Sequence, residues 1–554
     1  MKQRSPDRTA SIVGSALLLS TVYTLHIFDW AFISGTGPYW EHLQLWDLDR
    51  AQALIGWRHF ASDEWRFPLF WVASLSYPEG ANIIFTDSIP LVAFVFKIVR
   101  ELTGFEVNYL GLWMAFCYVM QGVAASLLMD ALGVRHRLAN LSGVLIALCA
   151  PILLGRFGHG ALCAHFLILL ALTSYFRLVE NPHRTWLWLF LLAAPGATLL
   201  VTSYLGVMLA AIAVATALES WRRRIVSPAV AIGVPATLVA IATAVMGGSG
   251  MIGPYAPSPV GSGYGHFSMN LLAPFFGNPE TYTQRLLGPV TVDATGGQYE
   301  GFNYLGFGVL VLSASWFASH PGQVWRSVRA HPALTTILVL LSIYAVSNDV
   351  FLGEMEVLRF ALPAPATRIA SAFRSSGRFF WPAYYVLTFG LLASVWHRFP
   401  GGAGLALLTV VACLQYVETQ PMRASVAVSS SRVNSPHFVG AEVAALVNRA
   451  ERLFVYPSYE CTLNDPRWPE PNSWRAAIVE LMLFTSHRAL ASNSAYVSRG
   501  RKDCDLERRS LPNGALDRGT LYVVRRTDAP AFTHDLGDTV SCLEKDSAFL
   551  CEAR

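Results

Sequence analysis

Long apolar runs separated by short polar stretches make up most of the chain. Runs long enough to cross a hydrocarbon core, roughly 17 to 25 residues each, recur from residue 10 to about residue 418 and then stop. We predict about eleven membrane spans. They are expected near residues 10–28, 109–132, 139–155, 161–179, 185–202, 205–220, 228–246, 302–318, 332–347, 380–396 and 401–418. The pattern predicts an α-helical polytopic membrane protein over residues 1–420.

The last part of the chain, residues 421–554, has the mixed pattern of a soluble domain. The stretches "AEVAALVNRA" and "SWRAAIVELMLF" have helical spacing, and "RLFVYP" and "GTLYVVRR" are typical of strands. A small α/β domain is therefore expected. It holds an even number of cysteines, which suits disulfides in an oxidising compartment. A predicted hairpin favours pairing Cys542 with Cys551, which leaves Cys461 with Cys504.

Composition agrees with this division. Only 14% of the residues are charged and 53% are hydrophobic, with a mean hydropathy of +0.40, whereas soluble proteins carry about 25% charged residues. The net charge of +4 is small and its basic residues are scattered between the spans. The composition therefore excludes a nucleic-acid-binding surface.

The basic residues predict the orientation of the spans. Lys2, Arg4 and Arg8 precede the first span, so the N-terminus is expected in the cytoplasm. The loop at about 30–108 and the C-terminal domain then lie outside. The run "SIPLVAFVFKIV" at 88–99 is too short to cross the bilayer and is predicted as an interfacial helix within that first loop.

Polar residues of unusual kinds gather in the external loops. They are Asp47, Asp49 and Asp87 in the first loop, followed by Arg156, His159, Tyr204, His266, Asn270, Glu300, Asn303, Arg374 and Arg378 in later ones. A carboxylate can deprotonate an acceptor hydroxyl, and guanidinium groups can hold a departing phosphate. Each acid alone is also compatible with an ordinary solvated loop. The spacing of Asp47 and Asp49 would allow a divalent metal ion as a cofactor, or reflect no more than a shared face of an extended segment.

Five stretches carry a resemblance to a known family. "WDLDRAQALIGWRHF", "FTDSIPLVAFVFK", "GHFSMNLLAPF", "GQYEGFNYLG" and "FRSSGRFFWP" resemble a bacterial subfamily of GT-C-fold, polyprenyl-phosphate-sugar-dependent membrane glycosyltransferases. The resemblance covers residues 40 to 420. It implies an inverting transfer with an aspartate of the first loop as general base, Asp49 being the first choice and Asp47 the second. The basic, proline-rich interfacial motif of aminoarabinose transferases and protein mannosyltransferases is not matched, since "DSIPLVAF" stands in that place.

The resemblance also implies partners and a location. The donor would be a polyprenyl-phosphate-linked sugar in the membrane lipid of a bacterial inner membrane, and the acceptor an envelope glycan, lipid or protein on the periplasmic side. The donor phosphate is expected at Arg374, Arg378 and Arg156. The sugar or acceptor is expected at Asp87, His159, Tyr204, His266, Asn270, Glu300 and Asn303. Three alternatives remain: a transporter or flippase of a lipid-linked saccharide, a non-catalytic envelope assembly protein, and a ligase that uses an undecaprenyl diphosphate donor.

Overall fold

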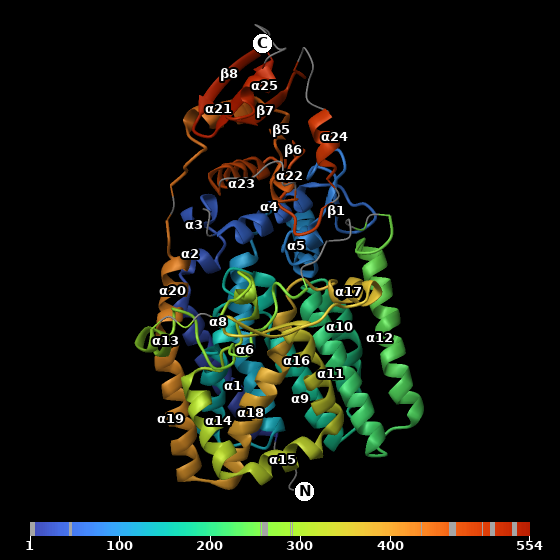
Figure 1. The fold of residues 1–554 in the computed structure, drawn as a ribbon, viewed down its shortest axis with the longest axis vertical. Coiled ribbons are helices and arrows are strands. Elements are labelled where there is room, and N and C mark those ends of the chain that lie inside the picture. Colours follow the sequence, from blue (N-terminus) through green and yellow to red (C-terminus); the bar gives the residue numbers. More distant parts are fainter. Residues whose placement is uncertain are drawn as a thin grey trace.

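A computed structural model gives the fold of the chain. It describes residues 6–43, 47–254, 256, 264–288, 290, 292–433, 435–464, 472–500, 502–509, 516–533 and 540–553. Figure 1 shows a long bundle of helices, with the first helix beginning at one end of the molecule and the C-terminal domain at the other. The chain is a multi-pass helical membrane protein with a separate α/β domain.

Each segment predicted to span the membrane contains a helix. These helices are α1 (Pro6–Ile27), α6 (Leu110–Ala131), α7 (Arg137–Leu148), α9 (Phe166–Glu180), α10 (Thr185–Leu199), α11 (Ser203–Arg222), α12 (Pro228–Ser249), α14 (Phe307–Ser319), α16 (Pro332–Val346), α18 (Trp381–Arg398) and α19 (Gly402–Glu418). Within the described residues, seven helical segments are long and apolar enough to cross a bilayer, or up to nine if each bent pair counts as one span. The apolar helices α10 and α14 are shorter than that length.

The bent pairs add helices beside the predicted spans. Helix α15 (Pro321–Ala330) meets α16 at 99°, and α20 (Gln420–Ser430) continues α19 after a 50° bend. No helix is expected where α15 lies, between the predicted spans at 302–318 and 332–347. Its "PGQVWRSVRA" is amphipathic, and no residue of it is buried. The helix lies across the end of the bundle that carries the N-terminus (Figure 1).

The loop between α1 and α6 folds into a compact layer above the bundle. It contains α2 (Trp30–Ile33), α3 (Pro38–Glu41), α4 (Leu48–Ser62), β1 (Trp71–Val72), β2 (Ala81–Asn82), the 3-10 helix η2 (Ile83–Phe85) and α5 (Pro90–Thr103). Helix α4 is buried from Arg50 to Ala61 because the C-terminal domain covers it on the side away from the bundle. Helix α5 confirms the helix predicted at 88–99, and Pro90 begins it at a position where no backbone N–H is needed.

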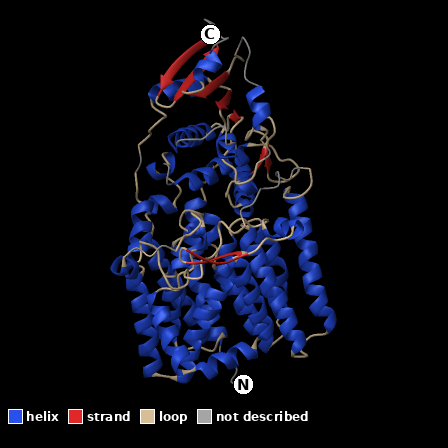
Figure 2. Ribbon diagram, in the orientation of Figure 1, coloured by secondary structure: helices blue, strands red, loops and turns tan. Residues whose placement is uncertain are grey.

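The C-terminal domain is built on a five-stranded sheet in the order β6-β5-β7-β9-β8. The strands are β5 (Arg452–Tyr456), β6 (Ala491–Ser492), β7 (Thr520–Arg525), β8 (Val540–Lys545) and β9 (Ala548–Ala553). Strand β5 runs parallel to β6 and β7, and β8 and β9 form an antiparallel hairpin. Figure 2 shows this sheet at the C-terminal end of the molecule, with the hairpin of β3 (Asp349–Leu352) and β4 (Met355–Arg359) lying lower, over the bundle.

The C-terminal domain also contains helices. They are α21 (Ala441–Arg449), α22 (Tyr459–Asn464), α23 (Asn472–Ser486), α24 (Cys504–Arg509) and α25 (Ala529–Thr533). Helix α23 packs on α4. Two disulfides, Cys461–Cys504 and Cys542–Cys551, join the cysteine pairs that the sequence favours. The first ties α22 to α24, and the second closes the hairpin of β8 and β9.

Candidate functional site

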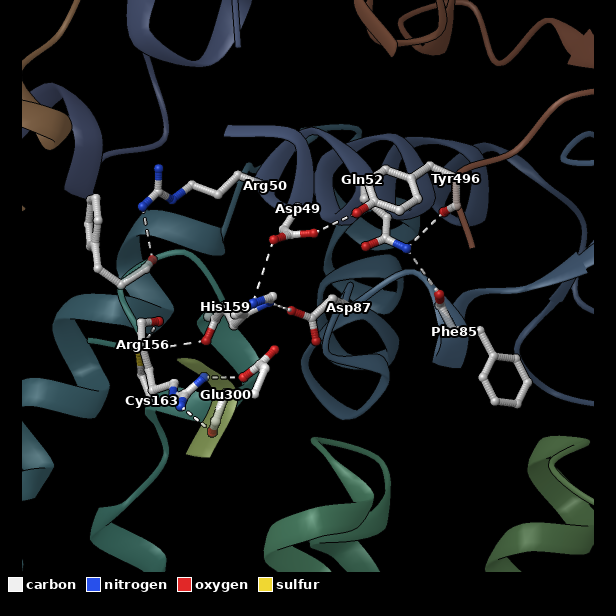
Figure 3. A network of polar contacts seen from close by, with 12 residues as sticks. Asp49, Arg50, Gln52, Phe85, Asp87, Arg156, His159, Cys163, Glu300 and Tyr496 are labelled. Atoms are coloured by element: carbon white, nitrogen blue, oxygen red, sulfur yellow. Dashed lines mark hydrogen bonds and ion pairs between the residues drawn. The ribbon is translucent and has the colours of Figure 1, made fainter. Parts of the chain in front are cut away.

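Asp49 stands at the start of α4, where the external layer faces the bundle. Its Oδ1 accepts a hydrogen bond of 2.7 Å from the hydroxyl of Tyr496, a residue of the C-terminal domain. Its Oδ2 lies 3.6 Å from Nε2 of His159. Figure 3 shows Asp49 between these two partners, so each carboxylate oxygen has a different neighbour.

His159 links Asp49 to a second carboxylate. Its Nδ1 lies 3.7 Å from Oδ2 of Asp87, on the other side of the ring (Figure 3). The ring belongs to the loop between α8 (Pro151–Leu154) and the 3-10 helix η3 (Gly160–Cys163). Burial alone would lower the pKa of His159, but Asp87 and Asp49 outweigh burial and raise it. The three side chains therefore favour an imidazolium held between two carboxylates.

The turn that carries Asp87 has an unusual backbone. Asp87 and Ile89 have φ angles of +57° and +53°. Such values are uncommon outside glycine and especially rare for a β-branched residue such as Ile89. The hydroxyls of Thr86 and Ser88 lie 2.6 Å apart, and Ser88 Oγ donates to the backbone oxygen of Ala53 in α4 at 2.7 Å. These bonds hold the turn against α4, so that Asp87 and Asp49 face the same imidazole.

A pocket opens beside these acids. The hollow is shallow, and the figure of about 310 Å³ for the space between its atoms includes the open solvent at its mouth. The lining residues are Phe32, Trp40, Asp49, Arg50, Ala53, Asp87, Leu110, Met114, Phe157, Gly158 and Gly160. Aromatic rings and carboxylates around one hollow are typical of a site for a ligand that has both apolar faces and hydroxyl groups.

Asp47 lies in a separate, buried cluster. Its Oδ1 contacts Nη1 of Arg50 and accepts a 3.3 Å hydrogen bond from the hydroxyl of Tyr39. Arg50 also donates to the backbone oxygen of Phe157 at 2.9 Å. The side chain of Asp47 is 4% exposed. Asp47 is thus engaged in an internal ion pair, while Asp49 is on the pocket.

A second charged cluster lies next to His159. Arg156 contacts Glu300 through Nη1 and donates to its backbone oxygen from Nη2 at 2.8 Å. Arg378 reaches the same carboxylate through Nη2 and Nε at 2.7 and 3.3 Å. Burial alone would raise the pKa of Glu300, but Arg378 and Arg156 outweigh burial and hold it well below the usual range. One carboxylate between two guanidinium groups leaves a formal charge of +1.

The segments that carry this cluster are fastened to one another. Glu300 belongs to the 3-10 helix η4 (Gln298–Gly301) and Arg378 to η5 (Ser376–Phe380). Asn303 joins the two because its amide donates to the backbone oxygens of Gly301 and Gly377, both at 2.9 Å. Tyr204 accepts from the backbone N–H of Ser375 at 3.0 Å, and its ring lies 4.6 Å from the guanidinium of Arg378. Asn303 and Tyr204 therefore support the arginine rather than line the pocket.

Three other predicted residues lie apart from both clusters. The amide of Asn270 donates to Gln298 at 3.0 Å and to the backbone oxygen of Gly353 at 2.8 Å, an internal structural contact. Arg374 is exposed, with its guanidinium 4.7 Å from the ring of Phe267. His266 is also exposed and packs on the same ring.

Two residues of the site do not emerge from the sequence pattern. Tyr496 lies 447 positions from Asp49 in the chain, and no motif around it marks it. Arg50 stands three residues after Asp47, a spacing that suits a helical ion pair, and this signal could have separated the two acids.

The arrangement does not resemble a metal centre. No group of three or more His, Cys, Asp or Glu side chains suited to a metal ion occurs in the described residues. The ring of His159 stands between Asp49 and Asp87, with one nitrogen toward each. These side chains do not converge on one point, so we derive no step through a metal ion.

The chain matches two protein-family models. Residues 17–420 match the model described as domain of unknown function DUF6311, and residues 442–553 match the model of the DUF6311 C-terminal domain. The chain belongs to the DUF6311 family. Asp49, Asp87, His159 and the Arg156–Glu300–Arg378 cluster all lie in the first match, whereas Tyr496 lies in the second. No curated protein matches the chain.

Solved structures with some likeness to this DUF6311 member are archaeal enzymes from Archaeoglobus fulgidus. One is the oligosaccharyltransferase AglB in complex with an inhibitory peptide and a dolichol-phosphate, at 12% identity and a TM-score of 0.42, covering 93% of this chain and 70% of that chain. Another is an oligosaccharyltransferase tethered to an acceptor peptide, at 13% identity and a TM-score of 0.40, covering 88% and 64%. A third, a complex with zinc and sulfate, has 12% identity and a TM-score of 0.41, covering 97% and 73%.

Proposed function

We propose that this protein is a GT-C-type membrane glycosyltransferase that transfers a sugar from a polyprenyl-phosphate donor, with Asp49 as the general base. The observation that carries the proposal is the position of Asp49. It lines a pocket, has one oxygen bound by Tyr496 and the other facing His159, and lies near a buried cluster with an excess guanidinium charge. Asp47 shares none of these properties, so the base is assigned to Asp49.

The reaction needs one proton transfer and one displacement. The hydroxyl oxygen of the acceptor forms a bond to the anomeric carbon, while the bond from that carbon to the phosphate oxygen breaks. The hydroxyl proton passes to Asp49, and the polyprenyl phosphate leaves with the electron pair. Attack from the side opposite the leaving group inverts the anomeric carbon. A base positioned in this way typically contributes about 10²- to 10⁴-fold to the rate.

The departing phosphate requires cations. Arg156 and Arg378 share Glu300, and Nε of Arg156 is buried with no hydrogen-bond partner among the described residues. The net charge of this cluster would stabilise the negative charge that develops on the leaving phosphate. Exposed Arg374 would meet the donor first, and a planar guanidinium suits a phosphate. Glu300 holds the two buried guanidinium groups in place before the donor arrives.

The sugar would lie in the pocket beside Asp49. Asp87 and His159 offer hydrogen-bonding groups, and Phe32, Trp40 and Phe157 form a buried aromatic wall behind them. Tyr204 and Asn303 would act through Arg378 and Glu300, which they hold. His266 and Asn270 remain predicted contacts of the sugar or acceptor.

The orientation in the membrane belongs to the same proposal. The N-terminus is on the cytoplasmic side of a bacterial inner membrane, and the external layer, the site and the C-terminal domain are periplasmic. The short helices α10 and α14 would complete eleven spans together with the seven long helical segments and the two bent pairs. An odd number of spans places the two ends of the chain on opposite sides, which agrees with their positions in Figure 1.

The test is a donor panel. Purified protein in lipid vesicles is incubated with radiolabelled polyprenyl-phosphate sugars and an envelope extract as acceptor, and loss of label from the lipid is followed. The Asp49→Asn variant runs beside the wild type. We expect release or transfer of label with at least one donor, and its loss in the variant. Equal release by a folded Asp49→Asn protein would contradict the assignment of the base. If no donor reacts while lipid-linked saccharide crosses the vesicle membrane, the protein is a flippase instead.

A further inference from the structure

A segment of the C-terminal domain, residues 491–500, lies across the external layer. It begins with β6, where Ser492 N–H donates to the backbone oxygen of Ser74 at 2.9 Å. The N–H of Tyr77 donates back to the oxygen of Ser492 at 2.7 Å. This paired contact resembles a short strand interaction between the two parts of the molecule. We call residues 491–500 the bridging segment.

The middle of the bridging segment is tied to both acid-bearing elements. Gln52 of α4 donates from its amide to the backbone oxygens of Tyr496 at 3.0 Å and of Phe85 at 3.2 Å (Figure 3). The N–H of Ser498 donates to the same oxygen of Phe85 at 2.7 Å. Gln52 lies one turn after Asp49, and Phe85 shortly precedes Asp87. The segment therefore fixes the helix of Asp49 relative to the turn of Asp87.

The far end of the bridging segment reaches the arginine side of the site. Arg499 donates to the backbone oxygen of Ala372 at 2.6 Å, and Ala372 stands just before Arg374 and Arg378 in the chain. The segment thus contacts the loop of the base and the loop of the cationic cluster at once. Other contacts of the C-terminal domain reach the first loop, where Arg58 donates to Ser486 Oγ at 3.3 Å and Lys502 lies 3.6 Å from Glu79.

A buried carboxylate anchors this segment. Glu460, which is 2% exposed, accepts from Ser76 Oγ at 2.8 Å and from the N–H of Ala495 at 2.9 Å. Cys461, the next residue, carries the disulfide to Cys504. Tyr496 directly follows Ala495, so its position depends on an anchor that is held covalently and by hydrogen bonds.

We propose that the C-terminal domain completes the catalytic site and that Tyr496 is a positioning residue, which holds Asp49 by its Oδ1 and leaves Oδ2 to take the proton of the acceptor. This inference rests on the proposed function of Asp49. Burial, reinforced by Asp49, raises the pKa of Tyr496, so the hydroxyl keeps its proton and donates. Tyr496 would therefore hold one oxygen of Asp49 in a fixed direction.

The decisive variant is Tyr496→Phe. The ring should stay in place, because it packs on Tyr459 with centroids 4.4 Å apart. Turnover of the donor found above is expected to fall by about tenfold or more, as for loss of a hydrogen bond to a charged group. The loss is expected in kcat, with KM within a few-fold of the wild type, because Tyr496 contacts the base and not the donor.

The matched control is Tyr522→Phe. Tyr522 lies on β7 and its hydroxyl accepts from the N–H of Asp517 at 3.3 Å, so the same hydroxyl is removed elsewhere in the domain. Its kcat and KM should equal those of the wild type. A loss in Tyr496→Phe that falls on KM and leaves kcat unchanged would contradict a role in positioning the base and would overturn the proposal. So would unchanged turnover in Tyr496→Phe.

The two proposals can fail separately. If Asp49→Asn is inactive and Tyr496→Phe is fully active, only the inference about Tyr496 fails. If Asp49→Asn is active, the proposed base fails. If the wild type turns over no donor, thermal unfolding of Asp49→Asn, Tyr496→Phe and the double variant tests the contact directly. Shifts in Tm that are not additive support it, because contacting residues couple. Additive shifts overturn it.

Discussion

Asp47 and Asp49 are two residues apart and have opposite surroundings. Asp47 is 4% exposed and is held by Arg50 and Tyr39, so its charge is balanced inside the protein. Asp49 is 35% exposed, lines the pocket and faces a histidine and a tyrosine from distant parts of the chain. Positions two apart at a helix start are separated by about 200° around the axis. One acid therefore faces the core of the external layer and the other the pocket.

The comparison teaches that the type of partner distinguishes a structural acid from a candidate base. Asp47 is held in an ion pair with Arg50 inside the protein, although burial outweighs that partner and raises the pKa of Asp47. The neighbours of Asp49 include His159, whose charge can change, and a pocket that a substrate can enter. The sequence alone does not show which of the two acids is structural and which is the candidate base. Variants of each residue can show it.

The largest expected effect is on catalysis by Asp49. Asp49→Asn keeps the shape of the side chain and can still accept from Tyr496, so the protein should fold with little change in Tm. Donor turnover should fall by about 10²- to 10⁴-fold, the usual contribution of a general base. Asp349→Asn is the matched control, since Asp349 lies on β3 in an ion pair with Arg359 at 2.7 Å, and its turnover should be that of the wild type.

Asp47→Asn should lower stability and leave turnover nearly unchanged, the opposite of Asp49→Asn. It leaves the charge of Arg50 buried without a carboxylate, and breaking a buried pair in this way lowers the free energy of unfolding by about 3 to 5 kcal/mol. Turnover per folded molecule should stay within a few-fold of the wild type. Thermal unfolding and an activity assay normalised to folded protein measure the two quantities. A loss of turnover as large as that of Asp49→Asn, without loss of stability, would reverse the two assignments.

The sequence predicts the helices well because membrane spans impose a length and a polarity that local composition reveals. The same logic misses α15, since a helix without buried residues has no such signature. The count of eleven spans stays a prediction, because α10 and α14 are apolar helices shorter than the length that crosses a bilayer.

The sequence predicts only part of the site, because a membrane topology shows which loops share a side but not which side chains touch. Asp49, Asp87 and His159 are expected to meet because alternate loops of a bundle lie on one side of a membrane. Their exact partners depend on contacts between distant parts of the chain: Arg156 and Glu300 are 144 residues apart, and Tyr496 and Asp49 are 447 apart. The sequence predicts that Arg374, Arg378 and Arg156 hold the donor phosphate, and the structure pairs Arg378 and Arg156 with Glu300.

A smaller effect on turnover is expected when the C-terminal domain, which contacts Asp49 through Tyr496, is destabilised. Replacing Cys461 and Cys504 by serine removes the disulfide beside Glu460 and should lower the stability of the domain by about 2 to 5 kcal/mol. Turnover should fall as well, since Asp49 depends on Tyr496. Replacing Cys542 and Cys551 is the control, because that disulfide lies in the hairpin of β8 and β9 and should affect stability alone. Equal turnover in the two double variants would disconnect Asp49 from the bridging segment.

The smallest effect concerns pH. Because the folded state raises the pKa of His159 above its ordinary value near 6.5, protonated His159 stabilises the fold fully below about pH 6.5. This contribution is lost as the pH rises through the raised pKa. The side chain is 30% exposed, so the effect should stay below about 1 kcal/mol.

The His159→Gln variant measures this contribution of protonated His159 to stability. The difference in Tm between wild type and variant should be largest in mildly acid solution and should shrink toward alkaline pH. In the Asp47→Asn background the same pH dependence should persist, since His159 faces Asp49 and Asp87 and not Asp47. In the Asp49→Asn background it should weaken, because one of the two carboxylates that hold the imidazolium is gone. A pH dependence that disappears with Asp47 instead would mean that the two acids share one electrostatic environment.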